Sequence, residues 1–170
     1  MEFRQATKED LQAMCRITEQ AKAQLLGMGV DQWQKGYPNR QVWEQDIRVG
    51  MAWLAVEEKQ VLGVFAFQTT PDVSYREIEG EWLTNTPYAS MHRVCVSDDS
   101  KGKGVAGAMF RHGFAMAKEQ GFASLRIDTH PENKPMQRAL GKAGFTRCGQ
   151  ITLRGGEEAG DARIAFEYIL

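Results

Sequence analysis

The residues from Val94 to Gly107 combine closely spaced glycines with two lysines. After Val94-Cys95-Val96 and a polar stretch over 97–100, the chain reads Lys101-Gly102-Lys103-Gly104-Val105-Ala106-Gly107. Glycine has no Cβ, so this backbone can approach a ligand closely. If a helix begins at Val105, its first N–H groups have no partner within the helix. They form the positive end of the helix dipole, which attracts an anion. The segment therefore predicts a phosphate-binding turn.

The same turn also matches a dinucleotide-binding pattern, because Gly102, Gly104 and Gly107 are spaced as Gly-x-Gly-x-x-Gly. Asp128 follows at about 20 residues, where that pattern has an acidic residue. In the dinucleotide fold, however, the first glycine directly follows the strand, whereas polar residues 97–100 intervene here. A nicotinamide-dinucleotide-binding protein is therefore the less favoured alternative.

Two side chains near this turn are candidates for proton transfer. Asp128 ends a predicted strand, where a carboxylate either acts as a base or bonds to local backbone. His92 lies in a second strand with the same side-chain parity as Val94 and Val96, and imidazole titrates in a useful range. A half-buried histidine bonded to a carbonyl is the alternative. Cys95, three residues from His92, is expected on the opposite face as a small buried hydrophobe.

Hydrophobic periodicity predicts a mixed α/β chain that forms a single domain over residues 1–170. Thr7 and Asp10 have the spacing of a helix cap. Residues 74–85 are polar and have no clear pattern. Strands are expected at 3–6, 51–57, 61–69, 89–96, 124–129, 145–153 and 162–169, and helices at 7–26, 39–49, 105–120 and 134–143.

Composition excludes several classes of protein. The formal net charge is -1 and no long apolar run occurs, so neither nucleic acid nor a membrane is an expected partner. Cys15, Cys95 and Cys148 are far apart, which argues against a disulfide framework and for the cytoplasm. No zinc-ligand spacing occurs, so no metal is expected. The N-terminus has no leader pattern.

Two motifs resemble those of the GNAT superfamily of N-acetyltransferases. Lys101 to Ala106 is similar to its Arg/Gln-x-x-Gly-x-Gly/Ala motif, with lysine at the first position. Asn133, followed by the segment Ala139 to Phe145, is similar to its Asn-x(n)-Leu-Tyr-x-Lys-x-Gly-Phe box. The order of elements agrees over nearly the whole chain. The runs Met91–Val96 and Arg126–His130 resemble a bacterial subgroup whose substrate is unassigned.

The resemblance implies a mixed, mostly antiparallel sheet of about seven strands with about four helices, and acetyl-CoA as co-substrate. Strands near 91–96 and 124–129 would splay apart around the pantetheine arm. The amine would attack the thioester directly in a ternary complex, without a covalent enzyme intermediate. The residues implied in cofactor binding are Val94, Cys95, Val96, Lys101, Gly102, Lys103, Gly104, Val105, Ala106, Gly107 and Asn133.

The resemblance also bears on catalysis. Asp128 lies five residues before Asn133, where some relatives have a catalytic glutamate, and relatives that act on aromatic amines have a histidine near the position of His92. Leu140 stands where many relatives have a tyrosine that protonates the leaving thiolate. Tyr88 or water would then serve, or the thiolate would leave unaided, since a thiol pKa is about 8.5. Leu140 also motivates a second hypothesis, a catalytically weak acyl-CoA-binding module.

The acceptor is expected to be a primary amine of a small molecule or peptide. Its pocket is assigned by the resemblance to the first two helices, their loop and the segment before residue 89. Trp33, Glu79, Trp82 and His130 are the candidate substrate-binding residues, because aromatic rings and carboxylates suit a cationic amine. Core packing of the tryptophans and solvated glutamates are the alternatives. The oligomeric state, a homodimer included, stays open.

Overall fold

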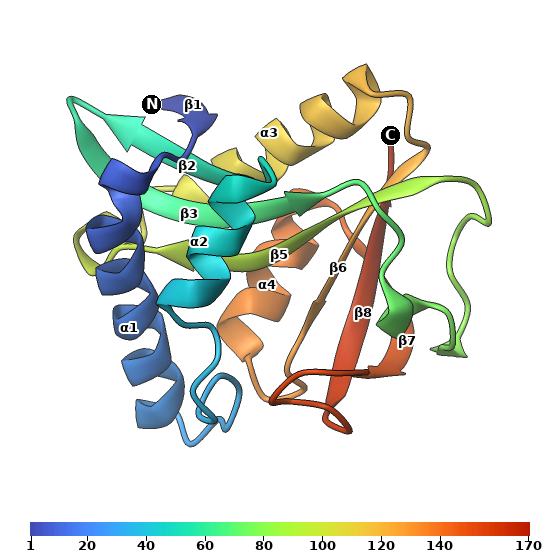
Figure 1. The fold of residues 1–170 in the computed structure, drawn as a ribbon. Coiled ribbons are helices and arrows are strands. Elements are labelled where there is room, and N and C mark those ends of the chain that lie inside the picture. The colour runs from blue at the N-terminus through green and yellow to red at the C-terminus, as the bar shows by residue number, and fades with distance from the viewer.

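The computed structural model describes residues 1–170 and contains one eight-stranded sheet (Figure 1). The strands are β1 (Glu2–Gln5), β2 (Ala52–Glu57), β3 (Gln60–Gln68), β4 (Glu79–Gly80), β5 (Tyr88–Val96), β6 (Ser124–Thr129), β7 (Thr146–Thr152) and β8 (Ala162–Ile169). The helices are α1 (Leu11–Gly27), α2 (Arg40–Arg48), α3 (Val105–Glu119) and α4 (Lys134–Ala143). No helix combines the length and the apolar character needed to cross a membrane.

The strand order is β1-β2-β3-β5-β6-β8-β7-β4. Only β5 and β6 run parallel; every other pair is antiparallel. The predicted mixed, mostly antiparallel sheet with four helices is therefore confirmed. The additional strand, β4, consists of two residues that pair with Gln150 and Gly149 of β7. A sheet with one parallel pair also differs from the parallel sheet of dinucleotide-binding folds.

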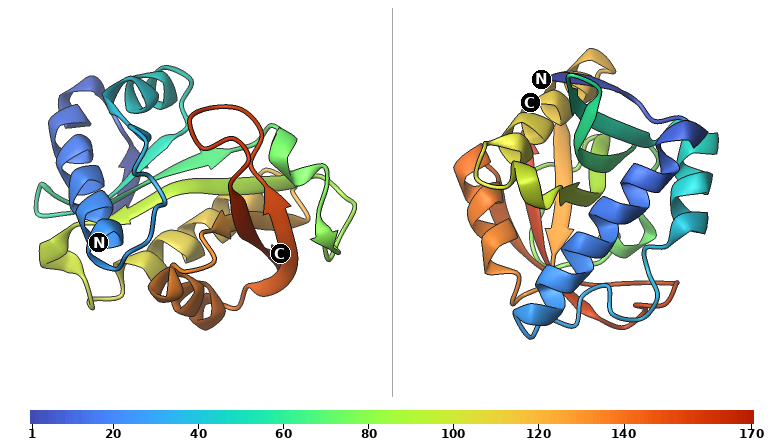
Figure 2. Two further views of the ribbon diagram at one scale, coloured as in Figure 1. Left: turned by 90° about the horizontal axis from the view of Figure 1, so that it is seen from below. Right: turned by 90° about the vertical axis from the view of Figure 1, so that its left-hand side faces the viewer.

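The helices cover both faces of the sheet, α1 and α2 on one and α3 and α4 on the other (Figure 2). The core on the α3/α4 face includes Met91, Met109 and Leu140, and the core on the α1/α2 face includes Met14, Trp43 and Val64. Strands with apolar residues on both sides fit this three-layer arrangement. Strands β5 and β6, which carry the candidate residues His92 and Asp128, lie at the centre of the sheet (Figure 1).

Local capping residues set several helix ends. The Thr7 and Asp10 pair forms the predicted capping box at a short 3-10 helix, Lys8–Asp10, that leads into α1. The Asn39 side chain accepts a hydrogen bond from the Val42 N–H at 3.1 Å at the start of α2. Asn133 caps α4 in the same way, because its Oδ1 accepts from the Met136 N–H at 3.2 Å. Gly144 ends α4 with φ of 94°. These ends match the predictions within a few residues.

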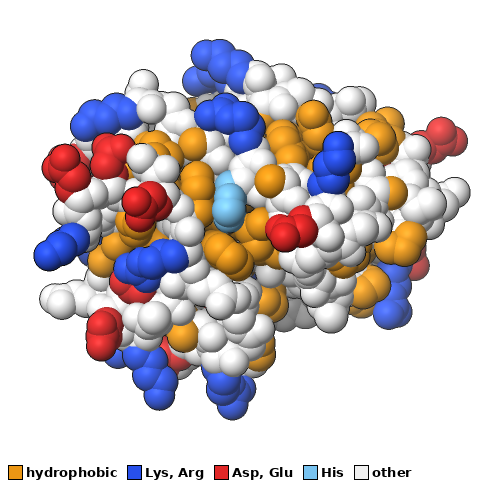
Figure 3. Space-filling view, turned by 90° about the horizontal axis from the view of Figure 1, so that it is seen from above, with side chains coloured by type: hydrophobic (Ala, Val, Ile, Leu, Met, Phe, Trp, Pro, Cys, Tyr) orange, Lys and Arg blue, Asp and Glu red, His pale blue; other side chains and the backbone are white.

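A shallow depression lies between β1 and α3. Its lining includes Phe3, Lys103, Gly104 and His112, and the Phe3 ring stacks on His112 with centroids 4.3 Å apart. Figure 3 shows the molecule from this side, where apolar side chains surround a histidine and both basic and acidic side chains lie farther out. Lys101 and Ala106, at the same end of α3, line a second and more enclosed cavity between β5 and β6, so the turn before α3 lies between the two hollows.

Candidate active site

The parallel strands β5 and β6 are paired only at their beginnings. The partners are Tyr88 with Ser124, Ala89 with Leu125 and Ser90 with Arg126. Beyond them, β5 continues to pair with β3, and β6 continues to pair with β8. The groups of β5 that face β6 from Met91 onward therefore have no strand partner. Such an open edge can hydrogen-bond an extended ligand.

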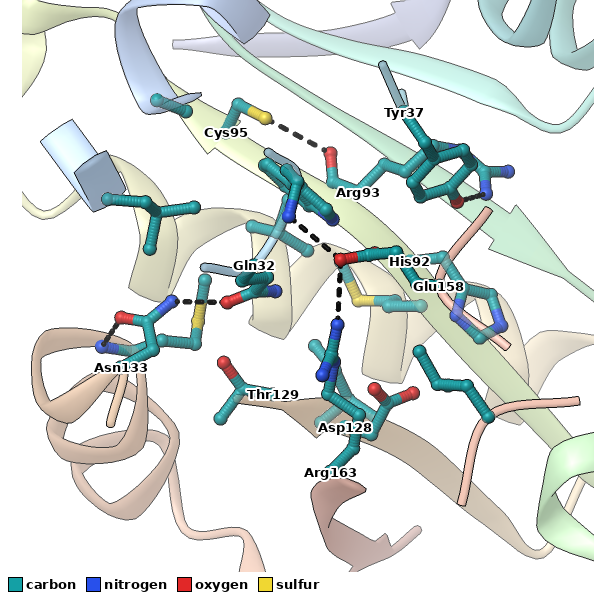
Figure 4. A pocket seen from close by; sticks show the side chains of 18 of the residues that line it. Gln32, Tyr37, His92, Arg93, Cys95, Asp128, Thr129, Asn133, Glu158 and Arg163 are labelled. Carbon is teal, nitrogen blue, oxygen red and sulfur yellow. Dashed lines mark hydrogen bonds and ion pairs between the residues drawn. The ribbon is translucent and has the colours of Figure 1, made fainter. Parts of the chain in front are cut away.

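A cavity of about 520 Å³ lies at this gap (Figure 4). Residues from β5 and β6 line its centre. The end of α1 and the segment 32–37 line one side, and α4 and the segment 153–158 complete the wall. The volume is within the range of pockets that enclose small ligands. The splayed strands thus open into a site large enough for part of a substrate.

A β-bulge interrupts β5 at Arg93, which has φ of 53°. On β3, Val64 pairs with Cys95 and Ala66 with His92, so β5 has one extra residue between these pairs. Cross-strand partners share a face, and Val64 and Ala66 both belong to the α1/α2 core. His92 and Cys95 therefore share that face. The prediction that His92 has the parity of Val94 and Val96, opposite Cys95, is wrong because the bulge shifts the alternation.

The bulge is fixed by a buried ion pair. The Arg93 guanidinium donates to both Asp46 carboxylate oxygens at 2.8 and 2.9 Å and to the Tyr37 hydroxyl at 2.7 Å. It also lies over the Trp43 ring. Burial raises the pKa of Asp46, and the charge of Arg93 opposes that effect. A left-handed conformation costs a non-glycine residue free energy, so these contacts must offset it.

Removing Asp46 should therefore destabilise the fold strongly. We expect Asp46→Ala to lower the free energy of unfolding by about 3 kcal/mol, because Arg93 is left buried without its partner. Glu44→Ala is the matched control on the same helix, since the Arg40–Glu44 pair is exposed and contributes less than about 0.5 kcal/mol. Urea denaturation measures both. Equal losses in the two variants would contradict the anchoring role of Asp46.

His92 reaches the cavity from β5. Its Nε2 lies 3.0 Å from the Ser90 Oγ and 3.4 Å from an Asp72 carboxylate oxygen. Burial, together with the positive charge of Arg93, lowers the pKa of His92 to about 4. The imidazole is therefore neutral at neutral pH. A neutral ring can accept a proton or orient a polar group, but it holds a proton weakly.

Asp128 reaches the cavity from β6. The buried Tyr75 hydroxyl donates to its Oδ2 at 2.7 Å. Burial raises the pKa of Asp128 to about 6, while the Tyr75 hydrogen bond and the charge of Arg163 oppose the rise. At neutral pH the carboxylate is ionised and close to its pKa. These are the properties of a general base, and Figure 4 shows Asp128 and His92 on two sides of one cavity.

The turn before α3 presents free backbone donors. The N–H groups of Gly102 and Gly104 and of residues 105–107 donate no hydrogen bond within the protein. Gly102 and Gly104 have φ of 75° and 79°, and a Cβ at either would meet no atom within 4 Å. Lys103 has no acidic partner, while Lys101 pairs with Asp98. Open space, free N–H groups and positive charge fit a diphosphate.

Hydrogen bonds and ion pairs join two loops at one end of the cavity, the segment 32–37 and the segment 153–161. The buried Glu158 carboxylate accepts from the Trp33 N–H at 2.8 Å and pairs with Arg163 at 2.9 Å (Figure 4). Lys35 and Asp161 form a second link between the same loops at 3.0 Å. Sequence reasoning named Trp33 as a candidate substrate-binding residue, but it missed its partners and the other residues of the two links, which are Lys35, Glu158, Asp161 and Arg163. The two links between the loops, Trp33 with Glu158 and Lys35 with Asp161, join residues that are 125 and 126 positions apart, so no local pattern marks them.

Most of the predicted site residues lie in or beside the cavity. Those that line it are Trp33, His92, Val94, Cys95, Val96, Lys101, Ala106, Asp128 and Asn133. Gly102, Lys103, Gly104, Val105 and Gly107 form the adjoining turn and the first turn of α3. Asn133 donates to the Gln32 Oε1 at 3.1 Å besides capping α4. Burial raises the pKa of the Cys95 thiol to about 12, so the thiol stays protonated at neutral pH.

Tyr88, Glu79, Trp82 and His130 do not line the cavity. The Tyr88 hydroxyl accepts from the Asp72 N–H, and its ring packs against Arg126. Trp82 donates to the Tyr75 carbonyl and covers the other side of Arg126. Glu79 is exposed on β4, and His130 pairs with Asp31 at 2.7 Å. This differs from their predicted placement around the substrate, since contacts with neighbouring residues hold Tyr88, Trp82 and His130 outside the cavity lining.

Comparison with known proteins identifies the family of this chain. The model of the family described as "Acetyltransferase (GNAT) family" matches residues 12–145. No curated protein gives a significant match. Among solved structures, a GNAT-family acetyltransferase from Streptococcus agalactiae is 32% identical, with 99% of this chain and 95% of that chain covered and a TM-score of 0.87.

Two more distant structures share the fold. An N-acetyltransferase from Staphylococcus aureus Mu50 is 20% identical, with a TM-score of 0.68 and coverage of 99% of this chain and 97% of that chain. A ribosomal-protein-alanine N-acetyltransferase from Brucella melitensis is also 20% identical, with a TM-score of 0.67 and full coverage of both chains, 100% each.

Proposed function

The chain belongs to the acetyltransferase (GNAT) family and is an acyltransferase, and from this premise we propose that it transfers an acetyl group from acetyl-CoA to a primary amine. The acceptor is a small molecule or a peptide, and its amine attacks directly in a ternary complex. The observation that carries this proposal is the open turn before α3 leading into the splayed strands, with Asp128 beside the gap. The residues of the turn fit the diphosphate of coenzyme A, as described above.

On the donor side, acetyl-CoA supplies an activated thioester carbonyl. The free N–H groups of the turn from Gly102 to Gly107 would hold its diphosphate. The open edge of β5 from Val94 to Val96 would hydrogen-bond the pantetheine arm, and a backbone N–H of this edge would polarise the carbonyl. The contribution of the protein is then mainly to place two substrates against each other.

On the acceptor side, the charges of the cavity favour a cationic amine. Each basic residue of the lining is paired with a carboxylate: Lys101 with Asp98, Arg93 with Asp46, Arg154 with Glu77 and Arg163 with Glu158. Asp72 and Asp128 also line the cavity and have no lysine or arginine partner. An uncompensated pair of carboxylates attracts an ammonium group and repels an acidic acceptor.

The proposed base makes a prediction about pH. With Asp128 as the group that accepts the amine proton, kcat/KM falls about tenfold per pH unit as pH decreases below a midpoint of about 6. The direction follows because protonated Asp128 cannot accept a proton. A midpoint near 4 would assign the base to His92 instead. The profile should be recorded with an acceptor whose own ammonium pKa is known, since the amine also titrates.

The direct test is release of coenzyme A thiol from acetyl-CoA across a panel of amines and peptides. We expect release above background with cationic amines and little with acidic ones. The second candidate, a weakly catalytic acyl-CoA-binding module, is favoured by Leu140, which is fully buried and provides no hydroxyl. Tight binding of acetyl-CoA with no release for any acceptor would select that candidate and contradict the transferase proposal.

A further inference from the structure

Thr129 has a buried hydroxyl without a partner. The residue is 1% exposed, and its Oγ1 makes no hydrogen bond within the protein. A buried hydroxyl left unpaired costs free energy, so such groups usually have a ligand or a water to bind. Thr129 lines the main cavity, and Figure 4 shows its oxygen pointing from the end of β6 into that cavity. The hydroxyl is therefore available to a bound substrate.

The position of Thr129 on β6 places this hydroxyl opposite Asp128. Thr129 pairs with Ile164 and is two residues beyond Ile127, and both isoleucines belong to the core under α3 and α4. Leu140 belongs to the same core. Thr129 therefore faces the α3/α4 side, while its neighbour Asp128 faces Tyr75 on the other side. The end of β6 presents a proton acceptor on one face and a hydroxyl on the other.

This arrangement corresponds to the two ends of the proposed reaction. The amine must lie within reach of Asp128, so the carbonyl carbon that it attacks lies beside the end of β6. The nitrogen and the leaving sulfur are bonded to that same carbon. A residue adjacent to Asp128 and directed to the opposite face is thus in a position to contact the sulfur. Leu140 on α4 has no group that could do so.

We propose that the Thr129 hydroxyl donates a hydrogen bond to the sulfur of coenzyme A and stabilises the departing thiolate; this inference rests on the proposed acetyl transfer. A C–N bond forms as the amine attacks, and the C–S bond breaks with its electron pair retained on sulfur. The amine proton goes to Asp128. Thr129 keeps its own proton, because a thiol with a pKa of about 8.5 leaves as an anion that needs stabilisation rather than full protonation. The thiolate afterwards takes a proton from solvent.

The experiment compares Thr129→Val, which has nearly the same shape and no hydroxyl, with Thr129→Ser, which retains the hydroxyl. The first readout is the pKa of the coenzyme A thiol in the complex, followed by the ultraviolet absorbance of the thiolate during a pH titration. We expect the wild type and Thr129→Ser to give the lower thiol pKa and Thr129→Val to raise it by about one pH unit, since a hydrogen bond to an ion contributes about that much. Thermal denaturation confirms that each variant is folded.

The second readout is acetyl transfer. We expect kcat of Thr129→Val to fall about tenfold and that of Thr129→Ser to stay near the wild-type value, with the KM for acetyl-CoA unchanged. An identical thiol pKa in the wild type and Thr129→Val would overturn the assignment. So would an equal loss of affinity for coenzyme A and for its desulfo analogue, because the hydroxyl would then bind the pantetheine arm. If the wild type binds coenzyme A but transfers no acetyl group, the proposed function fails while the thiol pKa still tests the hydrogen bond.

Discussion

Coenzyme A should lose at least about 100-fold in affinity when Gly104 is replaced by glutamate, a change of about 2.7 kcal/mol. The reason is that the added side chain would stand on the turn whose free N–H groups would hold the diphosphate, and a Cβ at this position meets no atom within 4 Å that could fold it away. Its negative charge would also repel that group. Isothermal titration calorimetry with coenzyme A measures the loss, and circular dichroism shows whether the fold persists.

Gly121 provides a matched control for this substitution. Gly104 and Gly121 lie just beyond the two ends of α3, both have φ of 79°, and a Cβ at either meets nothing within 4 Å. Glutamate at either position therefore has the same unfavourable backbone conformation, which costs about 1–2 kcal/mol. We expect similar melting temperatures for the two variants and loss of binding only for Gly104→Glu. Undiminished affinity in that variant would place the cofactor elsewhere.

The Asp128→Asn variant should be both less active and more stable. Asparagine can still accept the hydrogen bond from Tyr75, but it cannot take a proton from the amine. We expect kcat/KM to fall by about 10²–10⁴, the usual contribution of a general base. Retention of wild-type activity at neutral pH would exclude Asp128 as the base and direct attention to His92 or to water.

The stability change follows from the pKa of Asp128, which is about 6 in the fold and 3.8 ordinarily. Because the folded value is raised, the ionised carboxylate costs the native state free energy; the cost is absent below pH 3.8 and complete above pH 6. We expect Asp128→Asn to gain up to about 3 kcal/mol in unfolding free energy at pH 8 and less than about 1 kcal/mol at pH 4.

Urea denaturation at the two pH values measures this gain. Glu157→Gln is the control, because Glu157 lines the same cavity but is exposed, and an exposed substitution changes stability by less than about 0.5 kcal/mol. A gain of the same size at both pH values would mean that packing, and not ionisation of Asp128, accounts for it. An increase in stability on removal of a catalytic group is common, since such groups are held in environments that disfavour them.

The helix ends and turns were predictable from the sequence because single residues determine the local backbone conformation there. The cap at Asn133 and the left-handed glycines at Gly104 and Gly144 are set by the side chain, or its absence, at one position. The hairpin after β2 was predicted from the short polar break between two strand-like segments, although Glu58 and Lys59 adopt φ of 47° and 69°, which their side chains do not favour. β4 was not predicted because its two residues are a strand only through their pairing with β7.

The sequence by itself determined the turn before α3 and the two strands that flank the site, because glycine spacing and alternation act over a few residues. Only the tertiary structure decided the face of His92, since the bulge at Arg93 is held by Asp46 and Tyr37 from other elements. The environment of Asp128 likewise depends on Tyr75, which is 53 positions away. A pKa and a side-chain direction are set by neighbours in space, and these neighbours come together only when the chain folds.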